Sequence, residues 1–428
     1  MSNKKTPTKL GHTPLHLLKS THLLKSTPSI ILISMLTYLF CFLLGSALGL
    51  FASEFADRWG CSQRYRSPMP KKIFITLLSG TAAAWLYWWE VEMGMLLPPG
   101  MSSADIYTGI IGAYSLPSEQ SAIMMRQYVF HLVLFTFLLA ATLTDFYEMI
   151  IPDSITVVGT ITAVFLGACF IFSVPLPVTE YSAFLTTPSG APIVDTVAVC
   201  MHVWSPNPME TLVTNTMVGV YLIVALWWFW CFAMLDRVWY TQLPFRKAFA
   251  IFCRYLYRSP RTKYCIAAAL IVPFLFGFLT GFTGTAFYFL SALTGMAAGM
   301  ILVWSVRLVA QWVLGAEAMG FGDVTLMGMI GAFLGWQAVL LVFFIAPFFG
   351  LVYGIIHAAL GRGRAVPYGP FLCLATVVVV IAWSPIWAAM AEYFAFGIGT
   401  IGLVLLVLLV LFGGLLHVVH KLMSGLRR

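Results

Sequence analysis

Two aspartates stand at the ends of long apolar segments, where a charged side chain needs an explanation. Asp145 ends the segment 127–145, and Asp323 comes directly before the segment 324–345. A carboxylate in hydrocarbon costs roughly 2.5 kcal/mol or more and is rarely kept without a use. If two such groups approach closely, they cannot both ionise, so they share a proton and titrate separately. The ionised one can then activate water while the protonated one polarises a scissile carbonyl, which predicts acid–base peptide hydrolysis.

The residues around each aspartate suit this chemistry. Gly320 and Gly322 precede Asp323 and free the backbone to bend, which lets a substrate come close to the carboxylate. After Asp145 the chain reads Ile151-Pro152-Asp153, and we expect Asp153 to cap the helix that follows. The eight cysteines form no CxxC pair, so they predict neither a zinc site nor a disulfide scaffold.

In chain order these residues resemble the prepilin (type IV leader) peptidases, a family of membrane aspartyl peptidases with a GxGD motif. The resemblance rests on Asp145 before Ile151-Pro152-Asp153, on Gly320-Phe321-Gly322-Asp323, on Pro367-Tyr368-Gly369-Pro370-Phe371-Leu372 and, more weakly, on Leu44-Gly45-Ser46 with Arg58. It implies that Asp145 and Asp323 are catalytic. It implies supporting roles for Gly320, Gly322, Pro152, Asp153, Pro367, Gly369 and Pro370.

The resemblance also implies a function. The protein would remove short basic leader peptides from type IV pilin-like precursors at the cytoplasmic face of a bacterial inner membrane. The expected partners are therefore pilin-like precursor proteins and membrane lipid, with no nucleic acid, no cofactor and no metal; the oligomeric state stays open. Two readings from other classes are a proton-coupled transporter that uses the two aspartates, and an inactive relative that serves as a scaffold.

The chain departs from the family pattern in three places. The region 54–72, read as a cytoplasmic loop, contains Cys61 alone, where the family carries two CxxC pairs. The two aspartates lie unusually far apart because residues 176–263 are inserted between them, and Thr325 replaces a common lysine. We therefore expect leader cleavage without the N-methyltransferase activity that many members add.

Composition decides which elements must position these residues. Of 428 residues, 60% are hydrophobic and only 9% are charged, against about 25% charged in soluble domains. Apolar runs of about 20 residues, the length that spans a bilayer as a helix, recur from residue 29 to residue 420. The sequence predicts an all-α, polytopic transmembrane bundle of about ten or eleven helices, with segment 324–360 forming either two short helices or one long helix with a break near Pro347. Gly295/Gly299 and Gly331/Gly335 predict closely packed helices.

The apolar runs and the charges divide the chain into four parts. These are a polar extension (1–27), helices with the first aspartate (28–172), an insertion with an outer loop, a helix and a basic inner loop (173–264), and helices with the GxGD and PYGPFL motifs (265–428).

Lys and Arg placement predicts the orientation of these parts. Lys and Arg cluster in 58–72, 237–263, 362–364 and 421–428, and none lies in 176–211. The positive-inside rule then puts Asp145, Asp323 and 237–263 in the cytoplasm and 176–211 outside. The N-terminus, with five lysines, falls outside by this count, against the rule. We expect 237–263 to contact anionic lipid, and Glu90 and Glu92 to lie in an outer aromatic belt.

Overall fold

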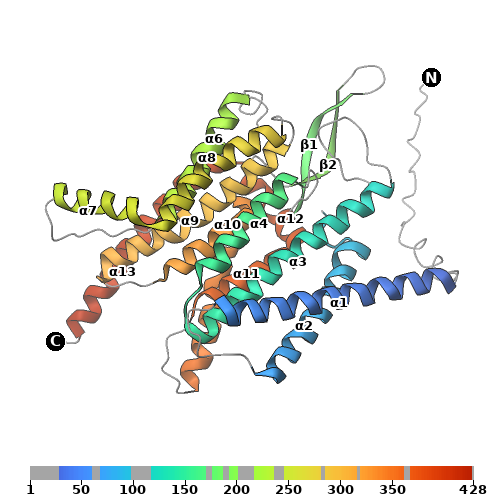
Figure 1. Cartoon of the computed structure of the whole chain (residues 1–428), viewed down its shortest axis with the longest axis horizontal. Helices are drawn as coiled ribbons and strands as arrows, with labels where there is room; N and C mark the ends of the chain where they lie inside the picture. Colours follow the sequence, from blue (N-terminus) through green and yellow to red (C-terminus); the bar gives the residue numbers. More distant parts are fainter. Residues whose placement is uncertain are drawn as a thin grey trace, which may run out of the picture.

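The computed structural model describes residues 28–59, 68–97, 117–169, 176–186, 192–200, 216–235, 245–280, 285–315, 319–360 and 367–426. These residues form a helical bundle with a two-stranded hairpin at one end (Figure 1). The elements are α1 (Pro28–Trp59), α2 (Met69–Tyr87), the π-helix η3 (Trp88–Glu92), α3 (Pro117–Glu148), α4 (Asp153–Cys169), β1 (Pro177–Thr186), β2 (Pro192–Cys200), α6 (Thr216–Ala233), α7 (Phe245–Arg258), α8 (Pro260–Thr280), α9 (Thr285–Leu314), α10 (Phe321–Ala359), α11 (Gly369–Ile381), α12 (Trp383–Phe394) and α13 (Gly397–Leu426).

The polytopic helical bundle predicted from composition is confirmed. Among the described residues, five helices are long and apolar enough to cross a membrane, or six if the bent pair α11 and α12 forms one span. The predicted count of ten or eleven is not reached there, because several apolar helices, such as Asp153–Leu166 and Tyr221–Ala233, are too short to be counted as membrane spans.

α10 occupies the centre of the bundle, and glycines bring α9 against it. Every residue of α10 from 323 to 340 is buried. A Cβ on Gly295 or on Gly331 would overlap the backbone of the other residue, so the two helices cross in direct backbone contact. The packing predicted from the paired glycines is confirmed here.

α10 turns back on itself at Gly335, whose φ of +81° and ψ of 170° are almost confined to glycine. The start of α10 lies beside Ile151, which is within contact distance of a Cβ on Gly322. After Gly335 the chain returns toward the same end, because Gly350 lies against Phe371 near the start of α11. Segment 324–360 therefore does form two helical arms, one of the two arrangements expected, but they meet at Gly335, and Pro347 lies inside the second arm.

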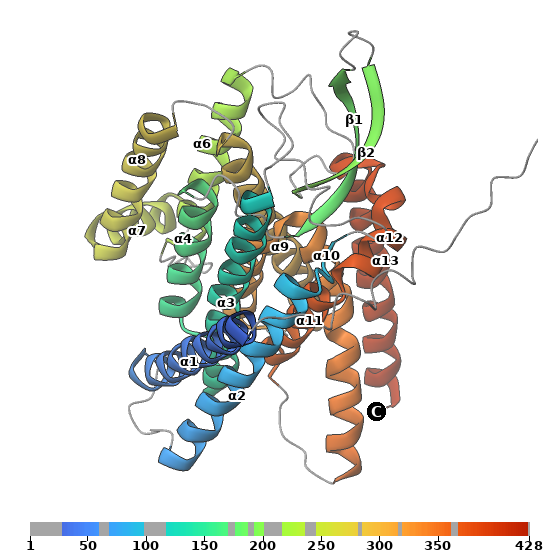
Figure 2. The ribbon, with the colours of Figure 1, turned by 90° about the vertical axis from the view of Figure 1, so that its right-hand side faces the viewer.

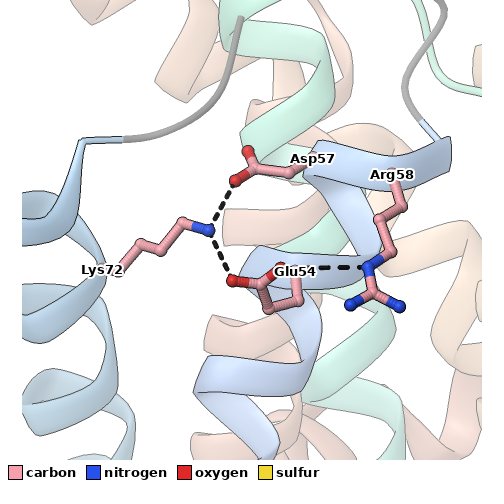
Figure 3. Close-up of polar contacts among 4 residues, drawn as sticks. All are labelled: Glu54, Asp57, Arg58 and Lys72. Carbon is pink, nitrogen blue, oxygen red and sulfur yellow. Dashed lines mark hydrogen bonds and ion pairs between the residues drawn. The ribbon is translucent and has the colours of Figure 1, made fainter. Parts of the chain in front are cut away.

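An ion-pair cluster closes the hairpin of α1 and α2. Lys72 Nζ lies 2.5 Å from Glu54 Oε1 and 2.8 Å from Asp57 Oδ2, while Arg58 Nε lies 3.9 Å from Glu54 Oε2 (Figure 3). α1 extends to Trp59 and α2 begins at Met69, so the loop expected over 54–72 is shorter at both ends.

The insertion contains more regular structure than the loops expected there. β1 and β2 pair antiparallel within the predicted outer loop, and α7 lies within the predicted basic inner loop. The two strands are rich in β-branched and aromatic residues and are separated by Pro188-Ser189-Gly190, a pattern typical of hairpins. Figure 2 shows the hairpin beside α12, which contacts β1.

The π-helix η3 turns Glu90 into the bundle. Its Oε1 lies 2.7 Å from His131 Nδ1, and both side chains are fully buried. The expectation that Glu90 lies in an outer aromatic belt is therefore wrong. Glu92 is exposed and accepts a hydrogen bond from the Tyr38 hydroxyl.

Candidate active site

Asp145 lies in the last turn of α3 and is held by the first residue of another helix. Its side chain is buried, with 5% of the residue exposed. The Gly369 N–H donates a hydrogen bond to Asp145 Oδ2 over 3.0 Å. Gly369 begins α11, so this N–H has no partner within its own helix. The N-terminal end of a helix also favours a negative charge, so α11 both orients and stabilises this carboxylate.

Asp323 lies at the third position of α10, where it is held by its own helix. Gly320 is the N-cap, and its backbone N–H donates to the Asp323 carboxylate. This is the backward half of a capping box, in which an acidic side chain at N3 satisfies the N–H of the cap residue. Asp323 is buried, with 8% exposed, so both predicted carboxylates lie at helix N-termini.

The structure brings the two aspartates together through Ile151. A Cβ on Gly322 would lie 3.0 Å from Ile151 Cβ, and a Cβ on Gly369 would lie 2.7 Å from Ile151 Cδ1. Ile151 thus packs between the first turn of α10 and the first residue of α11. The charge of Asp145 also influences Asp323, and both carboxylates are buried beside Ile151 and its neighbours.

Pro152 and Asp153 form the start of α4 beside this pair. The Pro152 carbonyl accepts a hydrogen bond from the Ile155 N–H over 3.0 Å. Asp153 is the first residue of α4 rather than the cap before it, so α4 begins one residue earlier than expected. Its carboxylate still lies at the positive end of the α4 dipole. Just before, Met149 has φ +53°, the only left-handed residue other than glycine in the described chain.

The segment from Pro367 to Pro370 leads into α11 and leaves no space at Gly369. A Cβ there would lie 2.6 Å from Asp145 Oδ2. Pro370 follows in the first turn, where its missing N–H costs no helical hydrogen bond. The Phe371 N–H donates to the Tyr368 carbonyl over 3.0 Å, which closes this turn.

Three further side chains reach the site, and of these only Tyr368 belongs to a motif on which the family resemblance rests. Burial raises the pKa of the Tyr368 phenol, and the charge of Asp323 raises it further, so the hydroxyl stays protonated at neutral pH. The Arg307 charge also acts on Asp323, and its guanidinium lies 5.8 Å from the ring centre of Phe321. Cys373 lies beside Thr142 and near both aspartates.

A signal for one of these residues was present in the sequence. Arg307 is a charge within an apolar helix, which by itself indicates a functional position. Nothing in the spacing of Tyr368 or Cys373 indicated contact with the aspartates, because that contact depends on how the helices pack.

Comparison with known proteins confirms the family resemblance. The model of the type IV leader peptidase family matches residues 260–355, a stretch that includes Gly320, Gly322 and Asp323. The matched stretch includes neither Asp145 nor Gly369.

Relatives named prepilin leader peptidase/N-methyltransferase show the same similarity. The one from Stutzerimonas stutzeri is 30% identical over 129 residues, which are 29% of this chain and 45% of the relative. The one from Pseudomonas aeruginosa is 32% identical over 116 residues, or 26% and 40% of the two chains. The match thus spans less than half the length of these relatives. No solved structure matches the chain.

Proposed function

We propose that this protein is a membrane aspartyl endopeptidase that removes short basic leader peptides from type IV pilin-like precursors. The observation that carries the proposal is the buried pair of Asp145 and Asp323, held at two helix N-termini. The pair lies in a chain whose residues 260–355 match the type IV leader peptidase family.

The mechanism follows from two carboxylates that share one proton. The ionised carboxylate takes a proton from water, whose oxygen attacks the scissile carbonyl carbon, while the protonated carboxylate donates to the carbonyl oxygen. The tetrahedral species then collapses, the C–N bond breaks, and the leaving amine receives a proton from the pair. The Gly369 N–H fixes Asp145 during these steps, and the Tyr368 hydroxyl supplies a further donor beside Asp323.

The position of the site determines how a substrate would lie across the membrane face. The leader would stay in the cytoplasm, the scissile bond would reach the pair, and the following apolar segment would lie among the helices within the inner membrane. Residues 28–172 and 265–428 would form the catalytic bundle, with 1–27 and 173–264 as additions. Membrane lipid would surround the apolar helices, many of whose side chains are exposed.

Leader release by the purified protein tests the proposal. The full chain in nanodiscs is incubated with a pilin-like precursor, and the products are identified by mass spectrometry. We expect cleavage by the wild type and none by Asp145→Asn or Asp323→Asn, because an amide can neither take the proton from water nor give one to the carbonyl oxygen. We expect substantial cleavage by Asp153→Asn.

The same experiment separates the proposal from its competitors. A folded wild type that leaves every precursor intact would point to a scaffold or a transporter. Near-normal cleavage by either of the first two variants, at equal protein levels, would exclude the paired-aspartate mechanism.

A further inference from the structure

α7 is a basic helix with exposed apolar residues, and we propose that it binds anionic phospholipid headgroups at the membrane face that carries Asp145 and Asp323. The helix belongs to the insertion and lies outside the helices that carry Asp145 and Asp323. Among the described elements it contacts chiefly α8. Figure 1 shows it extending away from the bundle, on the side opposite the β-hairpin.

Charge and apolar residues separate onto two sides of α7. The helix reads FRKAFAIFCRYLYR and contains no acidic residue. At 3.6 residues per turn, Lys247, Arg254 and Arg258 fall on one side. Phe245, Phe249, Phe252 and Leu256, at spacings of four, three and four, fall on the other side. A short helix with this division lies in the plane of a membrane interface.

Exposure agrees with this arrangement. Arg246, Lys247, Arg254 and Arg258 are all exposed. Phe249 is 49% exposed and Tyr257 is 83% exposed, so the bundle leaves about half or more of these two aromatic side chains uncovered. Insertion of aromatic residues between acyl chains would remove this area from water, while the basic side chains would meet phosphate.

The connections of α7 place it at the face that carries the aspartates. Trp227 Nε1 donates to the Ala268 carbonyl over 3.0 Å, which aligns α6 with α8. α8 is about 31 Å long at 1.5 Å per residue, enough to cross the bundle. α9 follows α8 and runs back from the far end of α8. Residues 315–320 then connect α9 to the start of α10, which carries Asp323. The start of α8, and α7 before it, therefore lie at the Asp323 end.

The join between α7 and α8 favours a lipid surface over an acidic protein. Only Ser259 separates α7 from α8, whose apolar stretch Thr262–Pro273 begins within its first turn, so the chain would enter the membrane close to the end of α7. α7 is thus held at headgroup level. An acidic soluble partner would engage the basic side and leave residues such as Phe249 in water.

Depth-dependent fluorescence on the full chain tests this proposal. Single cysteines replace Phe249 or Lys247 in a cysteine-free background, carry an environment-sensitive dye, and are studied in nanodiscs of phosphatidylcholine with or without phosphatidylglycerol. With phosphatidylglycerol, we expect several-fold stronger quenching by brominated acyl chains at position 249 than at position 247. In the protein labelled at position 249, phosphatidylglycerol should increase the quenching; reversing the charges of Arg246, Lys247, Arg254 and Arg258 should remove this increase, whereas Arg246→Lys, Arg254→Lys and Arg258→Lys together should keep it.

Two results would overturn the proposal. Equal quenching at position 249 in both bilayers would mean that anionic headgroups are not what α7 binds. A dye at position 249 that stays in water in both bilayers would show that α7 does not bind the membrane. An acidic protein would then be the candidate partner of α7. The thermal midpoint of each variant, matched to the wild type, ensures that these results report binding rather than unfolding.

Discussion

At the scale of single residues, the candidate site depends on a hydrogen bond that only a glycine permits. Asp145 is fixed by the Gly369 N–H, and a Cβ on Gly369 would lie 2.6 Å from Asp145 Oδ2 and 2.7 Å from Ile151 Cδ1. Either the carboxylate or Ile151 must move if that position carries a side chain. Because Ile151 also packs against Gly322, the movement would reach the first turn of α10.

Gly369→Ala is therefore expected to lower the rate of leader cleavage about 100-fold, the loss typical of a misplacement of about 1 Å in a catalytic constellation. The rate constant of leader release in nanodiscs measures this. Gly354→Ala is the matched control, because a Cβ there meets nothing within 4 Å. Equal rates for Gly369→Ala and the control would show that the position of Asp145 does not depend on Gly369.

The sequence could predict the two aspartates but not how each is held. Asp145 and Asp323 stood out because a carboxylate at the end of an apolar segment is costly. The donor to Asp145 lies on a helix far along the chain, so no local pattern contained it. The buried pair of Glu90 and His131 was missed because ordinary helical spacing does not describe the π-helix that turns Glu90 inward.

At the scale of elements, the reversal of α10 at Gly335 brings the GxGD end and the start of α11 to the same place. The first arm, residues 321–334, is about 21 Å long, less than the roughly 30 Å of hydrocarbon in a bilayer. The chain can reach Gly369 near Asp145 only because it turns back within the bundle.

Gly335→Ala is expected to lower the free energy of unfolding by about 1–3 kcal/mol, the cost of a side chain in this backbone region. Reversible unfolding in mixed micelles, followed by tryptophan fluorescence, measures the change. Gly354→Ala in the second arm is again the control, since both substitutions add one methyl group to the same helix. A loss no larger than that of the control would mean that the reversal tolerates an L-residue.

Apolar run length predicted the helices well and their breaks poorly. Hydropathy is high throughout 324–360, so the pattern did not distinguish one long helix from two arms. A proline can be accommodated inside a membrane helix, and Pro347 is, whereas the positive φ of Gly335 carries no signature in sequence. The hairpin of β1 and β2 did have one, in its β-branched runs, but a search for membrane spans passed over it.

At the scale of the whole molecule, the contacts place the basic start of α2 at the end of the bundle that carries the aspartates. Lys71 Nζ lies 5.4 Å from the ring centre of Tyr147, which puts the start of α2 beside the end of α3. α12, at the far end of α11 from Asp145, contacts β1. The hairpin and the aspartates therefore lie at opposite ends, in agreement with the orientation that the Lys and Arg placement predicts.

Single cysteines test this orientation in intact cells. In a cysteine-free background, a membrane-impermeant reagent should label position 190, in the hairpin region, and should leave position 250 in α7 unlabelled until the cells are opened. The reason is that basic segments are rarely translocated and stay on the cytoplasmic side of the membrane. Labelling of position 250 but not of 190 in intact cells would invert the topology and place the aspartates outside.

The names of the relatives include a second activity, that of an N-methyltransferase. The compact hairpin of α1 and α2 bears on whether this chain has it. Lys72 joins Glu54 and Asp57 within hydrogen-bond distance, and only residues 60–68 connect the two helices beyond this cluster. A metal-bound domain in that position would need about four ligands, commonly cysteine or histidine. Cys61 is the sole such residue in 60–68, and so short a stretch cannot bury a core of its own.

We therefore expect this protein to release leaders and leave the new N-terminus unmethylated, or methylated only to a small extent. Cleavage needs the aspartates and the helices that hold them, none of which lies between α1 and α2. A substrate processed in cells that contain no other peptidase of this kind, analysed by intact-mass spectrometry, gives the answer. A stoichiometric gain of one methyl group on the new N-terminal residue would contradict the prediction and would direct attention to residues 236–264 as the site that binds the methyl donor.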